Sequence, residues 1–172
     1  SGNLIQAKRR PPITVSGGGT EAIDFGEVGD VTGINSHVLD SLLAADLVPI
    51  IASLGIDPSG AVFNINADTT VVQIARAMSA ELLIFVTGIG GIFRDINDPA
   101  SRFADLDREQ AKKHISSGVI VGGMIPKVEE ALSLLESGVG TIAIVDAGQP
   151  TAFASIASGQ AEFGTLIRES SR

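Results

Sequence analysis

Residues 63–78 read Phe-Asn-Ile-Asn-Ala-Asp-Thr-Thr-Val-Val-Gln-Ile-Ala-Arg-Ala-Met, which joins the end of an apolar run to the start of an amphipathic helix. Asn66 is placed to cap this helix, because its side chain can accept from a backbone N–H two or three residues further on. Asp68 then falls in the first turn, where a negative charge suits the helix dipole. From these local features alone, Asp68 is a helix-start residue rather than a catalytic one.

The rest of the chain repeats this alternation of apolar runs and amphipathic helices. In the helix that follows Asn66, Val71, Ile74, Ala75 and Met78 recur with helical spacing, so this face is predicted to be buried. Strands are predicted at 4–8, 48–52, 82–86, 119–121, 141–145 and 164–167, and further helices after residue 35 or 36 and at 107–115, 124–138 and 149–157. The run at 82–86 is uninterrupted, which is typical of a strand covered on both faces.

The alternation predicts an α/β fold, a parallel-rich sheet sandwiched by helices. Near the N-terminus, the glycine run at 16–20 is followed by an extended segment rather than by a helix, so we expect a β-hairpin there instead of a phosphate-binding loop. No internal repeat or linker divides the sequence. A single domain over residues 1–172 is therefore expected.

Composition excludes several classes of function. The 172 residues include no cysteine and two histidines, so neither a disulfide framework nor a zinc site is expected. A net charge of −8 argues against a nucleic-acid surface, and no apolar run reaches the length of about 18 residues that a membrane helix needs. The lack of cysteine fits the reducing cytoplasm, which is the expected location.

Three loops compete for a ligand site: residues 64–68, 87–91 and 122–127. In a parallel sheet the loops that follow strands gather at one edge, where ligands bind. Gly122 and Gly123 let a phosphate approach the backbone, and the helix that starts at Met124 points its positive end there. Lys127 adds a full charge for a phosphoryl group in transfer. The alternative for Lys127 is a solvated side chain on an amphipathic helix.

The polar residues of the first loop suit the same chemistry. Asp68 can hold Lys127 and a second cation in place, and Asn64 can bind an amide-bearing or carboxylate substrate because its side chain both donates and accepts. These roles suit phosphoryl transfer, in which the protein mainly positions and neutralises. The sequence contains neither a Gly-x4-Gly-Lys-Ser/Thr motif nor a kinase catalytic-loop signature, which excludes two common nucleotide-kinase templates.

Several motifs, taken together and in order, resemble acetylglutamate kinase of the amino-acid kinase superfamily. The match covers nearly the whole chain, and its two most specific motifs are Asn-Ile-Asn-Ala-Asp at 64–68 and Gly-Gly-Met-Ile-Pro-Lys at 122–127. The supporting motifs are Val-Gly-Asp-Val at 28–31, Asn35, Val-Pro-Ile-Ile-Ala at 48–52 and Gly-Thr-Leu-Ile at 164–167.

This resemblance implies an enzyme that phosphorylates the γ-carboxylate of N-acetyl-L-glutamate in arginine biosynthesis, with ATP and with Mg²⁺ bound through the nucleotide rather than in a metal site of the protein. Asn64 would bind acetylglutamate, Asp68 would organise the catalytic lysines, and Lys127 would stabilise the transferring phosphoryl group. Because Lys127 and the two glycine loops are also expected at the same sheet edge as Asp68, the first interpretation of Asp68 is reversed in favour of a site residue. The implied nucleotide-binding residues are Thr87, Gly88, Gly91, Gly123, Met124 and Lys127. Small-molecule substrates and a homo-oligomer are expected, with no nucleic-acid or membrane partner.

Three departures from the family pattern shape these expectations. The family begins with a Lys-Gly-Gly strand end and a His-Gly-Gly-Gly loop that this chain does not show, so we expect the C-terminal, nucleotide-side portion with little activity by itself. Gly88 stands where the family usually has aspartate, and residues 142–149 lack the His and Arg of arginine-inhibited members. Two alternatives stay open: a non-catalytic kinase-like paralogue acting as a binding or assembly subunit, and an acid kinase with a different acceptor.

Overall fold

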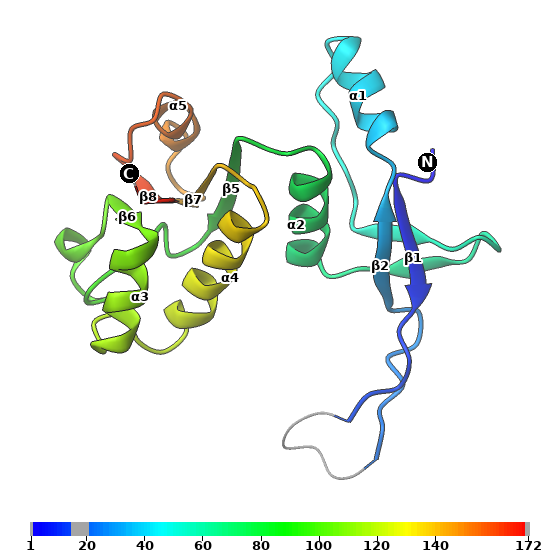
Figure 1. Ribbon diagram of the computed structural model, residues 1–172, viewed down its shortest axis with the longest axis horizontal. Coiled ribbons are helices and arrows are strands. Elements are labelled where there is room, and N and C mark those ends of the chain that lie inside the picture. Colours follow the sequence, from blue (N-terminus) through cyan, green and yellow to red (C-terminus); the bar gives the residue numbers. More distant parts are fainter. Residues whose placement is uncertain (1, 15–20, 171–172) are drawn as a thin grey trace. The chain divides into compact units, whose positions relative to one another are not determined.

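The computed structural model describes residues 2–14 and 21–170 (Figure 1). They divide into two compact units, Ser1–Met78 and Ser79–Arg172, which we call unit 1 and unit 2 and describe separately. The glycine run at 16–20, the expected hairpin loop, lies outside the described residues. The single domain over residues 1–172 stays a prediction.

Unit 1 contains a four-stranded sheet. Its strands are β1 (Ile5–Arg9), β2 (Gly29–Ile34), β3 (Leu54–Ile56) and β4 (Val62–Asn64), in the order β2-β1-β3-β4. β1 and β2 pair antiparallel from Ile5 opposite Ile34 to Arg9 opposite Gly29, which confirms the hairpin near the N-terminus. β1 and β3 are parallel, and β3 and β4 are antiparallel.

The described residues of unit 1 form two helices: α1 (Ser36–Ala44) and α2 (Ala67–Ala77). α2 begins as predicted, because Asn66 Oδ1 accepts from the backbone N–H of Thr69 at 2.9 Å. Its fully buried face differs from the prediction: Thr70 and Val72 are buried with Ala75, while the other predicted residues are half-buried. Thr70 tolerates burial because its hydroxyl donates to the Asn66 carbonyl at 3.1 Å.

The predicted buried strand at 48–52 is wrong. The segment forms no strand, Val48 is 88% exposed and Ile50 is 98% exposed. β3 begins only at Leu54, after this segment. A strand requires a neighbour as well as apolar residues, and within the described ranges 48–52 pairs with no other strand.

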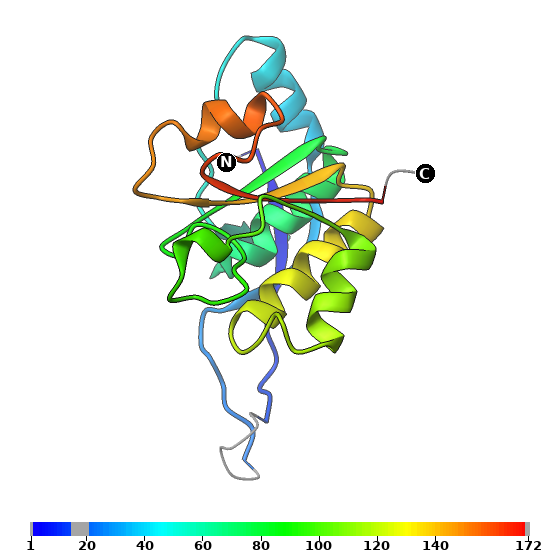
Figure 2. The ribbon, with the colours of Figure 1, turned by 90° about the vertical axis from the view of Figure 1, so that its left-hand side faces the viewer.

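Unit 2 contains the second sheet. Its strands are β5 (Leu82–Thr87), β6 (Asp105–Asp107), β7 (Thr141–Asp146) and β8 (Gly164–Arg168), in the order β5-β7-β8-β6. Figure 2 shows α3 (Arg108–Ser116) and α4 (Met124–Glu136) on one face of this sheet and α5 (Ala152–Ala157) on the other. A short 3₁₀ helix, η1 (Pro99–Ser101), lies in the polar connection after β5. The prediction of a sheet between helices is therefore confirmed for this unit.

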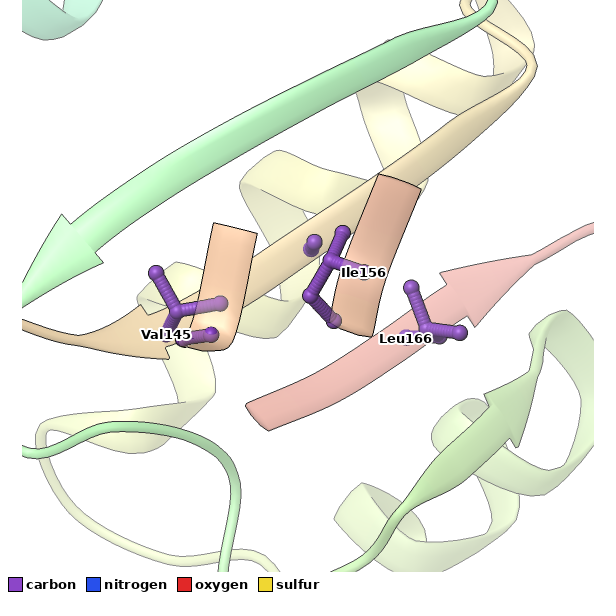
Figure 3. Close-up of a cluster of buried hydrophobic side chains, with 5 residues drawn as sticks. Val145, Ile156 and Leu166 are labelled. Atoms are coloured by element: carbon purple, nitrogen blue, oxygen red, sulfur yellow. The ribbon is translucent and has the colours of Figure 1, made fainter. Parts of the chain in front are cut away.

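The core of unit 2 is centred on β7, in which residues 142–145 are all buried. Figure 3 shows Val145 of β7, Ile156 of α5 and Leu166 of β8 meeting in a buried apolar cluster. On the other face, α4 buries its predicted stripe of residues: Val128, Ala131, Leu132 and Leu135. α3 also starts where predicted, with a capping box between Asp107 and Gln110.

Two further details of unit 2 depart from prediction. Residues 119–121 form a loop and no strand, because the N–H groups of Val119 and Ile120 donate back to the His114 carbonyl at the end of α3. β5 departs from the expected strand covered on both faces, because Leu83 is its one buried residue and Val86 is exposed. Across the described residues, three strand pairs are parallel and three antiparallel. The α/β class is confirmed.

No helix in the described part of the chain is long and apolar enough to cross a membrane.

Candidate nucleotide and acceptor sites

The two predicted site residues of unit 1 have free side chains. Asn64 ends β4, where its backbone N–H donates to the Glu27 carbonyl at 2.8 Å and its side-chain amide is exposed. Asp68 lies in the first turn of α2 and is also exposed. Neither side chain has a hydrogen-bond or ion-pair partner in the part of the chain that the structure describes. Asn66, between them, is engaged as the helix cap. Asn64 and Asp68 are thus available to a ligand.

In unit 2, the loop after β5 folds back over the end of β7. Thr87 and Asp146 are register partners at the carboxyl ends of these two parallel strands. Thr87 Oγ1 accepts from the N–H groups of Ile89 and Gly90, both at 3.3 Å. Gly90 has φ +66°, and a Cβ there would lie 2.6 Å from Asp146 Cβ, so only glycine fits. The loop is therefore a specific turn anchored on Thr87.

The two glycines predicted to face a nucleotide in this loop have different surroundings. Gly88 is exposed, and a Cβ at this position would meet no atom within 4 Å. Gly91 is buried, and a Cβ there would lie 2.8 Å from Thr165 Oγ1. Gly91 thus permits a close approach between the loop and β8, while Gly88 borders open space.

A pocket of about 220 Å³ opens beside this turn. Gly90, Asp146, Gln149 and Arg102 line it together with the rings of Phe93 and Phe163. Asp146 Oδ1 accepts from the Gly148 N–H at 2.8 Å, which fixes the carboxylate at the end of β7. Sequence reasoning missed Asp146 and Arg102. The available signal for Asp146 was its place directly after the apolar run 142–145.

Arg102 holds one wall of this pocket in place. Its guanidinium donates to the carbonyls of Ala161 at 3.0 Å, Glu162 at 2.7 Å and Gly164. Burial lowers the pKa of Arg102, although arginine stays charged at neutral pH. One side chain therefore ties the segment before β8 to the connection after β5.

The start of α4 carries the other predicted nucleotide residues. Gly123 is the N-cap and provides no side-chain cap. The N–H groups of Met124 and Ile125 make only long turn bonds, at 3.4 and 3.2 Å, to the carbonyls of residues 121 and 122. The N-terminus of a helix attracts anions because its first N–H groups are incompletely satisfied and the helix dipole is positive there.

Met124 connects this helix to the loop after β5. Its side chain is buried, and its Sδ accepts from the Phe93 N–H at 3.5 Å. Lys127, one turn further into α4, is half-buried and has no ion-pair partner among the described residues. Gly123, Met124 and Lys127 do not line the pocket beside Asp146. Two neighbouring elements of one unit thus present a glycine turn, a helix start and a free lysine.

No group of three or more His, Cys, Asp or Glu side chains arranged to hold a metal occurs in the described ranges. The roles of Asn64, Asp68, Thr87, Gly88, Gly91, Gly123, Met124 and Lys127 in binding or catalysis stay predictions.

Residues 3–146 match the sequence model of the Amino acid kinase family. The chain belongs to this family. Its motifs' resemblance to acetylglutamate kinase is confirmed by relatives of that name. The acetylglutamate kinase of Anaeromyxobacter sp. (strain Fw109-5) is 44% identical over 145 residues, which cover 84% of this chain and 54% of the relative. The acetylglutamate kinase of Sorangium cellulosum (strain So ce56) is 38% identical over 167 residues, which cover 97% of this chain and 59% of the relative.

A solved member of this fold is the N-acetylglutamate synthase of Neisseria gonorrhoeae, complexed with coenzyme A and L-arginine. It superposes with a TM-score of 0.75 at 21% identity, covering 99% of this chain and 37% of that one. Both the family match and this superposition support the amino acid kinase fold. The chain spans little more than half the length of the two acetylglutamate kinases.

Proposed function

We propose that this chain is the nucleotide-side part of an acetylglutamate kinase, an enzyme that transfers the γ-phosphoryl group of ATP to the γ-carboxylate of N-acetyl-L-glutamate. Identities of 44% and 38% to relatives of that name support the choice of reaction. The observation that carries the nucleotide assignment is the Phe93–Met124 contact, which joins the loop after β5 to the start of α4.

The donors on these two elements fit a nucleotide phosphate. The start of α4 offers incompletely bonded N–H groups and the positive end of the helix dipole, and Gly123 adds no side chain that would block an anion. Lys127 is free to contribute a full positive charge to the group in transfer. We assign Mg²⁺ to the phosphate oxygens of the nucleotide, where its charge would offset the charge of the phosphates.

The loop after β5 would contact the rest of the nucleotide. Thr87 fixes the turn, and Gly88 leaves open space beside it. An aspartate at position 88, as the family usually has, would find room here. Because Gly88 has no side chain to contact the nucleotide, we expect this chain to bind the nucleotide weakly.

On unit 1, Asn64 keeps its proposed role in binding the acetylglutamate acceptor, and Asp68 its role in orienting cationic groups. Support comes from their exposed side chains, which have no other partner in the described residues. The proposal includes the cytoplasmic location and the homo-oligomer that the sequence predicts.

Calorimetric titration with MgADP tests the nucleotide assignment. The chain should bind weakly but measurably, and Lys127→Ala should weaken binding about tenfold, because a charge-assisted contact of about 1.5 kcal/mol is lost. Lys112→Ala, which removes an exposed lysine from α3, is the matched control and should bind like wild type. Absence of binding heat in all three proteins would contradict the proposal and favour the non-catalytic paralogue.

A further inference from the structure

Arg102 contacts two parts of unit 2 that are far apart in the sequence: the glycine turn 87–91 and the segment before β8. It lies in the connection between β5 and β6, where it forms an isolated antiparallel bridge with Phe93. Its side chain is half-buried. The long stem and the guanidinium of this side chain make separate contacts, which together connect the turn to the sheet.

The stem of Arg102 packs directly on Gly91. A Cβ built on Gly91 would lie 3.1 Å from Arg102 Cδ, 3.4 Å from Arg102 Cγ and 2.8 Å from Thr165 Oγ1. Gly91 itself is buried. The place of the Gly91 backbone is therefore set by its contacts with Arg102 and Thr165, and a stem that moved would leave one of these contacts unmade.

The backbone N–H of Gly91 is not used inside the protein. Within the described ranges it donates to no acceptor, and the same holds for the N–H of Gly88. The N–H groups of Ile89 and Gly90, by contrast, donate to Thr87 Oγ1. An N–H without a partner in a buried residue is uncommon and calls for a ligand or water to bond it. The turn thus offers donors whose use depends on how the backbone is held.

The guanidinium of Arg102 is fixed at the opposite end of the side chain. It donates to the carbonyls of Ala161 at 3.0 Å, Glu162 at 2.7 Å and Gly164. The backbone pairing of β6 with β8 begins only after Gly164, so the side chain continues the bonding of this edge of β8 where the ladder stops. A planar guanidinium presents its donors in a rigid fork, which a lysine ammonium does not.

The segment that holds the guanidinium leads into the interior of the sheet. β8 is paired on one side with β7 and on the other with β6. Core strands of this kind are the parts of a domain that open least often, while loops open readily. Arg102 therefore ties a turn, which by itself has few hydrogen bonds, to a rigid part of unit 2.

We propose that Arg102 is a positioning residue for the nucleotide, because it holds Gly91, and with it the turn 87–91, in the geometry that the bound nucleotide contacts. Its own guanidinium is engaged by carbonyls, so Arg102 acts through Gly91 rather than on the ligand. This inference rests on the proposed function, which assigns the turn to the nucleotide. Donors that are held in place before binding need not be ordered when the ligand arrives, which favours affinity.

The test is an NMR titration of the ¹⁵N-labelled chain and of its variants with MgADP, well below their melting temperatures. Arg102→Ala should need at least about tenfold more MgADP for half-saturation, because small displacements of positioned contacts are costly. Arg102→Lys keeps the stem and the charge but loses the fork, so its affinity should fall between those of the wild type and the alanine variant.

Arg94→Ala is the matched control. It removes an exposed arginine from the same connection, whose guanidinium lies 5.1 Å from the centroid of the Phe103 ring. Arg94 donates no side-chain hydrogen bond to the segment before β8 in the described residues. This variant should bind MgADP like the wild type.

Two readouts separate positioning from a merely structural role. If Arg102 contributed only to stability, folded Arg102→Ala would melt earlier but bind MgADP with unchanged affinity. We expect instead that the resonances of Gly88 and Gly91 shift in the free alanine variant, while those of Gly123 stay in place. Ethylguanidinium, which replaces the deleted part of the side chain, should restore affinity to Arg102→Ala, and ethylammonium should not.

The outcomes distinguish this inference from the proposed function. A wild-type chain that binds no MgADP would contradict the proposed function and the role of Arg102 with it. Saturable binding by the wild type together with equal affinity in folded Arg102→Ala would overturn the role of Arg102 alone. If the alanine variant does not fold, Arg102→Lys decides, and wild-type affinity in that variant would overturn the proposal.

Discussion

At the scale of single residues, Thr165 shows how a buried polar group organises unit 2. It is 0% exposed, and its Oγ1 accepts from the Ile92 N–H at 2.9 Å and donates to the Phe103 carbonyl at 2.6 Å. The hydroxyl thus ties both ends of the connection after β5 to the start of β8. Sequence reasoning predicted the strand but not this role, because the partners are 73 and 62 residues away along the chain.

Thr165→Val should lower the free energy of unfolding by about 2 kcal/mol, because it keeps the shape but leaves a buried N–H and a partly buried carbonyl without a partner. Thr165→Ser retains the hydroxyl and should lower the free energy of unfolding by less than Thr165→Val does. Urea unfolding followed by circular dichroism is the measurement, since the chain has no Trp or Tyr. A valine variant as stable as the wild type would show that the two hydrogen bonds contribute little.

At the scale of elements, the loop after β5 contains two glycines with opposite requirements. Gly90→Ala should lower the free energy of unfolding by at least about 1 kcal/mol, because a residue with a Cβ is strained at φ +66° and would meet Asp146. Gly88→Ala, two residues earlier in open space, should change it by less than about 0.5 kcal/mol. Urea unfolding curves measure the free energy of unfolding of both variants. Equal losses at the two positions would contradict this description of the turn.

Most elements could be predicted from the sequence because their signals are local. The Asn66 and Asp107 caps, the buried stripe of α4 and the apolar run of β7 involve residues within a few positions of one another. The failures at 48–52 and 119–121 have a tertiary cause. An apolar run indicates burial, but whether it becomes a strand depends on a neighbour to pair with. At 119–121 the backbone N–H groups of Val119 and Ile120 donate instead to the His114 carbonyl at the end of α3.

At the scale of the whole molecule, the sequence predicted the α/β class but not the pairing. β8 runs antiparallel to β7, and strand direction is not encoded in a strand's own residues. In the structure the Phe93 N–H donates to Met124 Sδ, so the connection after β5 contacts the start of α4, while the binding roles of the two glycine motifs stay predictions. Asp146 and Arg102 were missed, because the pocket they line exists only once β5, β7 and the segment before β8 are assembled.

The loop after β5 and the start of α4 are the two elements proposed to bind a nucleotide. The most direct test of this proposal is an NMR titration of the ¹⁵N-labelled chain with MgADP, which reports on every backbone amide separately. The amides of Thr87, Gly88, Gly123, Met124 and Lys127 should shift progressively and saturate with one dissociation constant, and Lys127→Ala should require about tenfold more MgADP for the same shifts. Shifts that do not saturate, or that are largest outside residues 87–91 and 122–127, would contradict the proposal.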